Sequence, residues 1–274
     1  MSLIGVFDTG VGGLSILDEA LRQLPQNDYI YLADSANAPY GEKTPDWIAQ
    51  RSLNLCKHLA EAGCDAIVVA CNTATAEAIK DIRAAIPIPI VGVEPGIKPA
   101  AMQSVNGIVG VLATEATLNS DKFNALLSTL PSHCQFIKQA GAGLVPLIEA
   151  GKANDGETLE LLAKHLEPIQ VAGSDTIVLG CTHYPFLRKA IRKLLGDKIT
   201  LIDTSEAVVK QLKRQLEVLA LNQADSANDD SSEYGAVHFF SSKDEQALLK
   251  MAQDLMHTDL KNHRVSTAQL GSIS

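Results

Sequence analysis

The stretch that decides the fold occurs twice in this chain, as DAIVVACNT at residues 65–73 and as DTIVLGCTH at residues 175–183. Each copy begins with an acidic residue, continues as an apolar run rich in β-branched residues, and reaches a cysteine where polar side chains begin. Such a run predicts a buried strand that ends in a thiol. Cys71 of the first copy corresponds to Cys181 of the second, an offset of 110 residues (181 − 71).

The repetition extends beyond the cysteines. IGVFDT at residues 4–9 is echoed by IVGVLAT at residues 108–114, and Gly5 and Gly110 are offset by 105 residues (110 − 5). Two nearly equal offsets indicate that one α/β unit has been duplicated. Apolar residues at helical spacing follow each cysteine, so we expect each thiol in a strand-to-helix turn. The alternation of strands and helices predicts an α/β fold with mainly parallel sheets in two similar domains.

The same patterns predict the remaining elements. Expected strands cover residues 3–7, 29–33, 88–93, 135–140, 199–203 and 237–240. Expected helices cover residues 14–24, 45–62, 118–127, 155–166, 205–221 and 244–256. Pro89 favours an edge strand or a strand start. The polar residues 222–233 predict a mobile surface loop, and the tail beyond residue 258 shows no clear pattern.

Composition excludes several classes of protein. The chain has 274 residues, enough for two domains, and its 46% hydrophobic and 20% charged residues are typical of a soluble globular protein. A net charge of −9 leaves no electrostatic footprint for nucleic acid, and no apolar run is long enough to span a membrane. Met1 leads almost directly into a strand, so we expect no signal peptide and a cytoplasmic location. Five cysteines without a CxxC pair predict free thiols, with three of them as buried hydrophobes: Cys56, Cys64 and Cys134.

Cys71 and Cys181 have a context that favours reactivity. In parallel α/β sheets ligands bind beyond the carboxyl ends of the strands, where a helix N-terminus also favours thiolate over thiol. On a duplicated scaffold, two such thiols would face each other between the halves. That arrangement suits a reaction that needs an acid and a base on opposite sides of one carbon. A metal site formed with His183 is disfavoured, because the ligands lack short-spaced pairs.

Other polar residues near the predicted strand ends have two interpretations each. Asp8 is either a helix cap or a cleft carboxylate that binds an ammonium group or tunes a thiol. His183 is either an exposed turn residue or a partner for the Cys181 proton. Asp34 and Glu149 are either solvated loop carboxylates or site residues. Hydroxyl and amide side chains near the turns would serve as caps or as donors to a substrate carboxylate: Thr9, Asn72, Thr73 and Thr182.

Two other functions have less support in the sequence: dinucleotide binding and pyridoxal-dependent catalysis. Gly10 and Gly12 resemble the start of a dinucleotide fingerprint with Asp34 as the ribose acid, but Ser15 occupies the third glycine position. No lysine stands in a context that marks a Schiff-base former, so a pyridoxal enzyme is not supported. A non-catalytic amino-acid or nucleotide-binding module with structural cysteines is the alternative outside enzymes.

Beginning with the DTGVGG turn at residues 8–13, the chain carries three most specific motifs: PYG at residues 39–41, ACNTA at residues 70–74 and GCTHYP at residues 180–185. With these motifs the chain resembles the glutamate racemases of the cofactor-independent aspartate/glutamate racemase superfamily. The resemblance implies an active site between two α/β domains, residues 1–97 with 208–274 and residues 98–207. It departs from the family at Thr9, where serine is common.

The resemblance also implies roles for individual residues. Cys71 is the expected base towards D-glutamate and Cys181 the expected base towards L-glutamate, each acting as the acid in the other direction. Glu149 matches a carboxylate that assists His183. The residues that match the substrate-binding positions are Asp8, Thr9, Tyr40, Gly41, Asn72, Thr73, Thr182 and His183. The implied reaction uses no cofactor or metal and supplies D-glutamate for peptidoglycan, while aspartate or a hydantoin is the alternative substrate. A homodimer is the default assembly.

Overall fold

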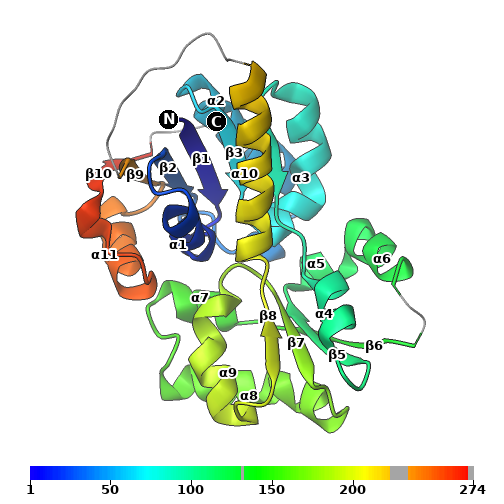
Figure 1. Ribbon diagram of the computed structural model, residues 1–274. Helices are drawn as coiled ribbons and strands as arrows, with labels where there is room; N and C mark the ends of the chain where they lie inside the picture. Colours follow the sequence, from blue (N-terminus) through cyan, green and yellow to red (C-terminus); the bar gives the residue numbers. More distant parts are fainter. Residues whose placement is uncertain (131–132, 223–233, 271–274) are drawn as a thin grey trace. The chain divides into compact units, whose positions relative to one another are not determined.

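The computed structural model describes residues 1–130, 133–222 and 234–270. The chain divides into two compact units, Met1–Val93 with Ser205–Ser274 and Glu94–Thr204. Each unit is built on one parallel β-sheet with helices packed on it (Figure 1). The predicted α/β class with parallel sheets is therefore confirmed.

The first unit contains a six-stranded sheet in the order β10-β9-β2-β1-β3-β4. All its pairings are parallel. The strands are β1 (Leu3–Asp8), β2 (Asp28–Ala33), β3 (Ala66–Val69), β4 (Ile90–Gly92), β9 (Ala236–Ser241) and β10 (Arg264–Gln269). Pro89 directly precedes β4 at the edge of the sheet, as its missing N–H predicts.

Helices cover both faces of this sheet (Figure 1). One face carries α2 (Pro45–Glu61) and α3 (Asn72–Ala85), and the other carries α1 (Leu14–Gln23), α10 (Ser205–Asn222) and α11 (Glu245–Leu255). Short 3-10 helices are η1 (Tyr40–Glu42) and η3 (Leu260–Asn262). The Thr44 hydroxyl caps α2 with Pro45 in its first turn, and Gly63 follows the helix with φ +89°.

The second unit contains a four-stranded parallel sheet in the order β6-β5-β7-β8. Its strands are β5 (Ile108–Ala113), β6 (Gln135–Ala140), β7 (Thr176–Gly180) and β8 (Thr200–Ile202). Its helices are α4 (Ile97–Gln103), α5 (Glu115–Asn119), α6 (Asp121–Ser128), α7 (Leu144–Glu149), α8 (Gly156–Val171), α9 (Arg188–Leu195) and the 3-10 helix η2 (Tyr184–Leu187).

The duplication predicted from the sequence is present in the strand order and register. The order β2-β1-β3-β4 in the first unit corresponds to β6-β5-β7-β8 in the second. Gly5 pairs with Ile67 between β1 and β3, and Gly110 pairs with Ile177 between β5 and β7. The repeated sequences therefore occupy equivalent positions in the two sheets.

The acidic residue that opens each repeated stretch has a structural role. Asp65 Oδ2 accepts a hydrogen bond from the Leu3 N–H at 2.8 Å, at the start of β1. Asp175 Oδ2 accepts from the N–H groups of Val105 and Asn106 at 2.7 and 2.9 Å, just before β5. Each acidic side chain thus fixes the beginning of a neighbouring strand that is distant from it in sequence.

Two expectations need correction, and a third concerns residues outside the described ranges. The helix expected over residues 118–127 is two helices, α5 and α6, because the Ser120 hydroxyl accepts from the Phe123 N–H and starts a new helix. The tail without a clear pattern contains η3 and the edge strand β10. The loop predicted at residues 222–233 lies, beyond Asn222, outside the described residues.

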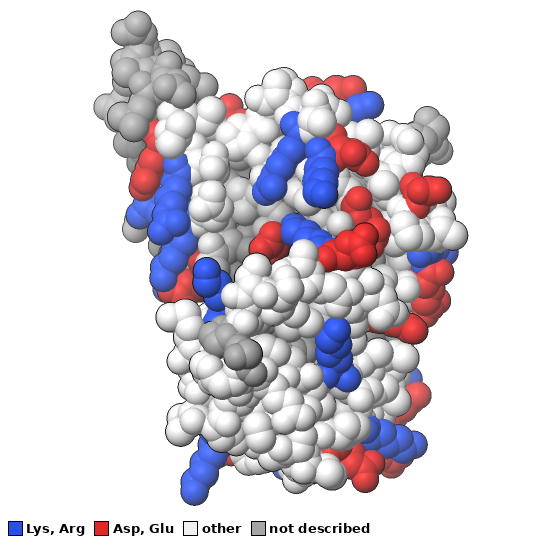
Figure 2. All heavy atoms as spheres, turned by 90° about the vertical axis from the view of Figure 1, so that its right-hand side faces the viewer, with Lys and Arg blue, Asp and Glu red and all other residues white. Residues whose placement is uncertain are grey.

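No helix within the described part of the chain is long and apolar enough to cross a membrane. Figure 2 shows one face of the molecule, on which lysine and arginine side chains are interspersed with aspartate and glutamate. On that face the cations do not gather into a single patch. This mixture agrees with the net charge of −9.

Candidate active site

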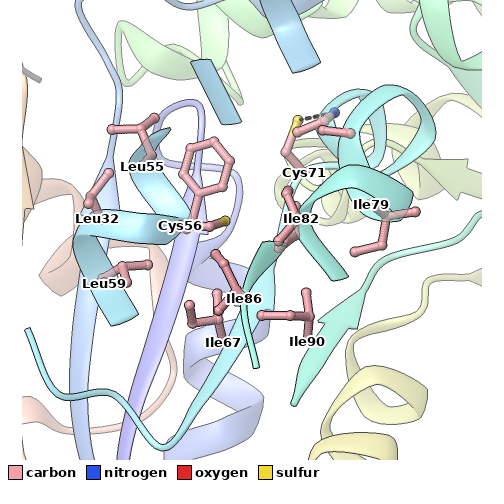
Figure 3. Close-up of a cluster of buried hydrophobic side chains, with 14 of the residues drawn as sticks. Leu32, Leu55, Cys56, Leu59, Ile67, Cys71, Ile79, Ile82, Ile86 and Ile90 are labelled. Atoms are coloured by element: carbon pink, nitrogen blue, oxygen red, sulfur yellow. Dashed lines mark hydrogen bonds between the residues drawn. The ribbon is translucent and has the colours of Figure 1, made fainter. Parts of the chain in front are cut away.

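Cys71 lies at the point where β3 gives way to α3. It is the N-cap residue of α3, and its Sγ accepts a hydrogen bond from the Ala74 N–H at 3.4 Å. The side chain is only 6% exposed and belongs to the apolar cluster under α2 and α3. Figure 3 shows Cys71 at the end of this cluster, with its sulfur directed at the first turn of α3. The expected strand-to-helix turn is confirmed here, with the thiol itself as the cap in place of Asn72 or Thr73.

The structure distinguishes this thiol from Cys56 and Cys64. Cys56 lies inside the apolar cluster, and burial raises its pKa far above the ordinary value (Figure 3). Burial, with a smaller effect of Asp65, raises the pKa of Cys64 to about 12. Both are buried hydrophobes, as expected. Cys134 is only partly buried, which corrects the expectation for that residue, and all five cysteines are free thiols.

Asp8 and Thr9 leave the strand next to that of Cys71. The two strand ends are joined by a hydrogen bond from the Ala70 N–H to the Phe7 carbonyl at 2.7 Å. Asp8 is fully buried, and its Oδ2 accepts from the Gly10 N–H at 3.1 Å. The cap position of α1 belongs to Gly13, so Asp8 is not the cap of that helix.

Tyr40 and Gly41 lie in η1. The Tyr40 side chain is held by the charged side chains of Asp34 and Arg51. Its hydroxyl donates to Asp34 Oδ2 at 2.7 Å. Arg51 of α2 donates from Nε to the same oxygen at 2.9 Å and from a terminal nitrogen to Oδ1 at 2.8 Å. Although burial acts in the opposite direction, hydrogen bonds from Arg51, Tyr40 and Asn37 lower the pKa of Asp34.

This network corrects two interpretations of Asp34. The carboxylate is fully buried and ion-paired, so it is neither a solvated loop residue nor an acid available to a ribose. Sequence reasoning missed Arg51 altogether. A usable signal existed, because Arg51 shares the apolar face of α2 with Ile48 and Leu55, and a charge on such a face requires a buried partner.

Asn72 and Thr73 are buried in the first turn of α3. The Asn72 Nδ2 group is enclosed and has no hydrogen-bond partner among the described residues. A buried amide donor without a partner costs free energy, on the order of 1–3 kcal/mol. Asn72 directly follows Cys71, so this donor lies at the start of α3 next to the thiol residue.

The second unit places Cys181, His183 and Glu149 in a chain of contacts. Cys181 Sγ lies 3.8 Å from His183 Nδ1, and His183 Nε2 lies 2.5 Å from Glu149 Oε1 at the end of α7. Burial disfavours the imidazolium, but the hydrogen bonds to Cys181 and Glu149 and the charges of both raise the pKa of His183 well above its usual range. His183 is therefore not an exposed turn residue, and Glu149 is not a free loop carboxylate.

The turn after Cys181 differs from the expected one. No α-helix begins at this cysteine: residues 181–183 lead into the 3-10 helix η2, and α9 starts only at Arg188. Thr182 is buried in the turn. The Tyr184 hydroxyl donates to the Gly141 carbonyl at 3.2 Å, and this hydrogen bond fixes the turn. The two cysteines thus have different electrostatic surroundings, a helix N-terminus at Cys71 and an imidazole–carboxylate pair at Cys181.

The structure groups the predicted site residues by unit. Those at the strand ends of the first unit are Asp8, Thr9, Tyr40, Gly41, Cys71, Asn72 and Thr73. Those of the second unit are Glu149, Cys181, Thr182 and His183. Within the described ranges, no three His, Cys, Asp or Glu side chains are arranged to hold a metal ion.

Comparisons with known proteins support the family that these motifs indicate. The profile of the Asp/Glu/Hydantoin racemase family matches residues 7–212. A glutamate racemase of Cupriavidus pinatubonensis is 46% identical over 263 residues, covering 96% of this chain and 94% of the relative. One of Ralstonia pickettii is 50% identical over 224 residues, covering 82% and 79%.

Among solved structures, Escherichia coli glutamate racemase in complex with L-glutamate and the activator UDP-MurNAc-ala matches with a TM-score of 0.83. The two chains are 32% identical, and the match covers 98% of each. Sequence profile, relatives and fold agree over most of the chain. The protein therefore belongs to the Asp/Glu/Hydantoin racemase family.

Proposed function

We propose that this protein is a glutamate racemase that interconverts L- and D-glutamate with Cys71 and Cys181 as its two bases. One observation carries the proposal: two thiols follow equivalent strands, β3 and β7, in two sheets with the same strand order and register. The names of the relatives support glutamate as the substrate. The structure of a Francisella tularensis glutamate racemase in complex with D-glutamate also resembles this chain, with a TM-score of 0.78 and 27% identity.

In the proposed reaction, a thiolate removes the α-proton from one face of the substrate and the opposing thiol delivers a proton to the other face. Cys71 deprotonates D-glutamate and Cys181 deprotonates L-glutamate. After each turnover the two cysteines have exchanged their protonation states. Proton exchange with water resets them for another turnover in the same direction, so no redox or group-transfer step is required.

Each thiolate is stabilised in a different way. The positive end of α3 and the Ala74 N–H favour negative charge on Cys71. His183 does the same for Cys181, because Glu149 favours the imidazolium form. Asp8 is assigned to the Cys71 side of the reaction, next to the substrate ammonium group.

Substrate binding is assigned mainly to uncharged donors in the turns that follow the strands. An α-proton next to a carboxylate is weakly acidic, so the site must stabilise the negative charge that develops when it leaves. The enclosed Asn72 Nδ2 group is such a donor. The other assigned residues are Asp8, Thr9, Tyr40, Gly41, Thr73, Thr182 and His183.

The proposed biological role is the supply of D-glutamate for peptidoglycan in the cytoplasm. The resemblance to glutamate racemases implies this role, and the proposed reaction would give a cell that holds L-glutamate a source of D-glutamate. The reaction as written needs no cofactor. A homodimer remains the default proposal for the assembly.

Circular dichroism of the substrate tests the function directly. We expect the purified protein, dialysed against a chelator and given no cofactor, to remove the optical activity of L-glutamate and of D-glutamate until each solution is racemic. Parallel reactions with L-aspartate and a 5-substituted hydantoin test the alternative substrates. Faster racemisation of either than of glutamate would overturn the assignment of substrate, and no racemisation of any would favour a binding module.

A further inference from the structure

The ion pair of Asp34 and Arg51 is built into the first unit but has no part in the chemistry above. Asp34 is completely buried, and the side chain of Arg51 is only 15% exposed. Desolvating two charges costs roughly as much free energy as their attraction returns, so a buried pair is weak grounds for stability alone. A role in fixing geometry explains its presence better.

The geometry of the pair points at Tyr40. Arg51 binds both oxygens of Asp34, and such a two-pronged contact fixes the plane of a carboxylate. The fixed Oδ2 then accepts the Tyr40 hydroxyl at 2.7 Å. The phenol is thereby committed as a donor to Asp34, so the part of Tyr40 left for a ligand is its backbone in the turn with Gly41.

Tyr40 shares a buried cluster with Cys71 and packs against Trp47. The Tyr40 ring lies in the same buried cluster as Cys71. It also makes an edge-on contact with Trp47, with ring centroids 5.1 Å apart and an interplanar angle of 82°. A displacement of Tyr40 would therefore change the surroundings of this tryptophan, which is the only one in the chain.

We propose that Asp34 and Arg51 are positioning residues: their ion pair holds the Tyr40 hydroxyl and so fixes the Tyr40–Gly41 turn beside Cys71 for substrate binding. The proposal rests on the function proposed above for this turn. Neither residue is assigned a contact with substrate. Their effect is exerted through the placement of Tyr40.

The test compares Arg51→Met, Arg51→Lys and Tyr40→Phe with wild type. Removing Arg51 leaves a buried carboxylate unpaired and threatens folding. Tyr40→Phe leaves the ion pair intact and removes only the hydroxyl, so it tests the tether in a folded protein. Arg22→Met is the matched control, because it breaks an arginine–carboxylate pair with Glu19 on the exposed face of α1.

For each variant, KM and kcat are measured with both enantiomers, together with far-UV circular dichroism and the emission and acrylamide quenching of Trp47. We expect Arg51→Met and Tyr40→Phe to raise KM and to lower kcat/KM at least about tenfold, since displacement of a positioned group by 1 Å can cost about a hundredfold. Arg51→Lys restores part of the loss. Trp47 emission and quenching change in both impaired variants, while far-UV signals and Arg22→Met stay as in wild type.

An unchanged KM and unchanged Trp47 emission in folded Arg51→Met and Tyr40→Phe would overturn the proposal. So would a loss of activity that only follows the fraction of unfolded protein. If wild type fails to racemise glutamate, the proposed function fails. The fluorescence comparison still decides separately whether Asp34 and Arg51 hold Tyr40 in place.

Discussion

Replacing Glu149 by glutamine tests the account of Cys181 most specifically. Glutamine keeps the shape of the side chain and a hydrogen bond to His183 Nε2 but removes the negative charge. A hydrogen bond to a charged group contributes about 1.5–3 kcal/mol, against about 0.5–1.5 kcal/mol for a neutral one. The difference of about 1–1.5 kcal/mol is stabilisation of the His183 imidazolium that Glu149→Gln removes, and it corresponds to a factor of roughly ten in rate if the imidazolium balances the charge at Cys181 in the reaction. We therefore expect a roughly tenfold fall in kcat/KM for Glu149→Gln.

The equilibrium of the reaction adds a constraint. L- and D-glutamate have equal free energies in water, so kcat/KM for the two directions must stay equal in every variant. Glu149→Gln must lower both by the same factor, whereas kcat and KM for each enantiomer can change separately. Circular dichroism from each enantiomer measures these quantities. The matched control is Glu157→Gln, whose carboxylate pairs with Lys152 on the exposed surface of the same unit. A wild-type kcat/KM for Glu149→Gln would refute the reasoning.

The same substitution changes the pH dependence of stability. The pKa of His183 is raised on folding, so its contribution to stability is fully present below its unfolded pKa, about 6.5, and is lost as pH rises through the folded pKa. Glu149→Gln removes part of this contribution. Its deficit in unfolding free energy should be largest near about pH 6 and shrink at higher pH. Urea unfolding across this range measures it, and a deficit that grows with pH would contradict the prediction.

Three further substitutions test the packing and the caps. Gly13→Ala would place a Cβ 2.7 Å from Asp8 Cβ, so we expect a loss of about 1–3 kcal/mol in thermal unfolding, and an unchanged midpoint would contradict it. Burial lowers the pKa of His263, so the wild type should lose stability as pH falls below about 6.5, and His263→Gln should lose less. The midpoint of unfolding, measured as a function of pH, checks this difference. Ser120→Ala should cost about 1 kcal/mol in urea unfolding, because it removes the cap of α6, and a cost near zero would count against that cap.

The strands and the positions of both thiols were predictable because they depend on local pattern. A short apolar run rich in β-branched residues specifies a buried strand wherever it lies. The nearly equal offsets of the repeated stretches then predicted the duplication of the α/β unit. Caps such as Thr44 before Pro45 also act locally, so the start of α2 was predictable.

Features that depend on distant partners were not predictable. The edge strand β10 is polar and partly exposed, and only its pairing with β9 identifies it. Asp34 and Arg51 are separated in sequence and meet only in the folded unit. The turn after Cys181 was predicted as an α-helix start because apolar residues follow it at helical spacing, yet the chain forms a 3-10 helix there first. Each of these is decided by tertiary contacts.

The origin of the proton in the product tests the central claim most directly. Wild type is given L-glutamate or D-glutamate with protium at the α-carbon in D2O, and early product and remaining substrate are separated and measured by NMR and mass spectrometry. Two bases predict deuterium in the product and protium in the remaining substrate. Cys71→Ser and Cys181→Ser should each abolish racemisation, whereas Cys134→Ser, at a partly exposed thiol of the second unit, should leave it unchanged. Product that keeps its original α-protium, or full activity in both Cys71→Ser and Cys181→Ser, would contradict the account.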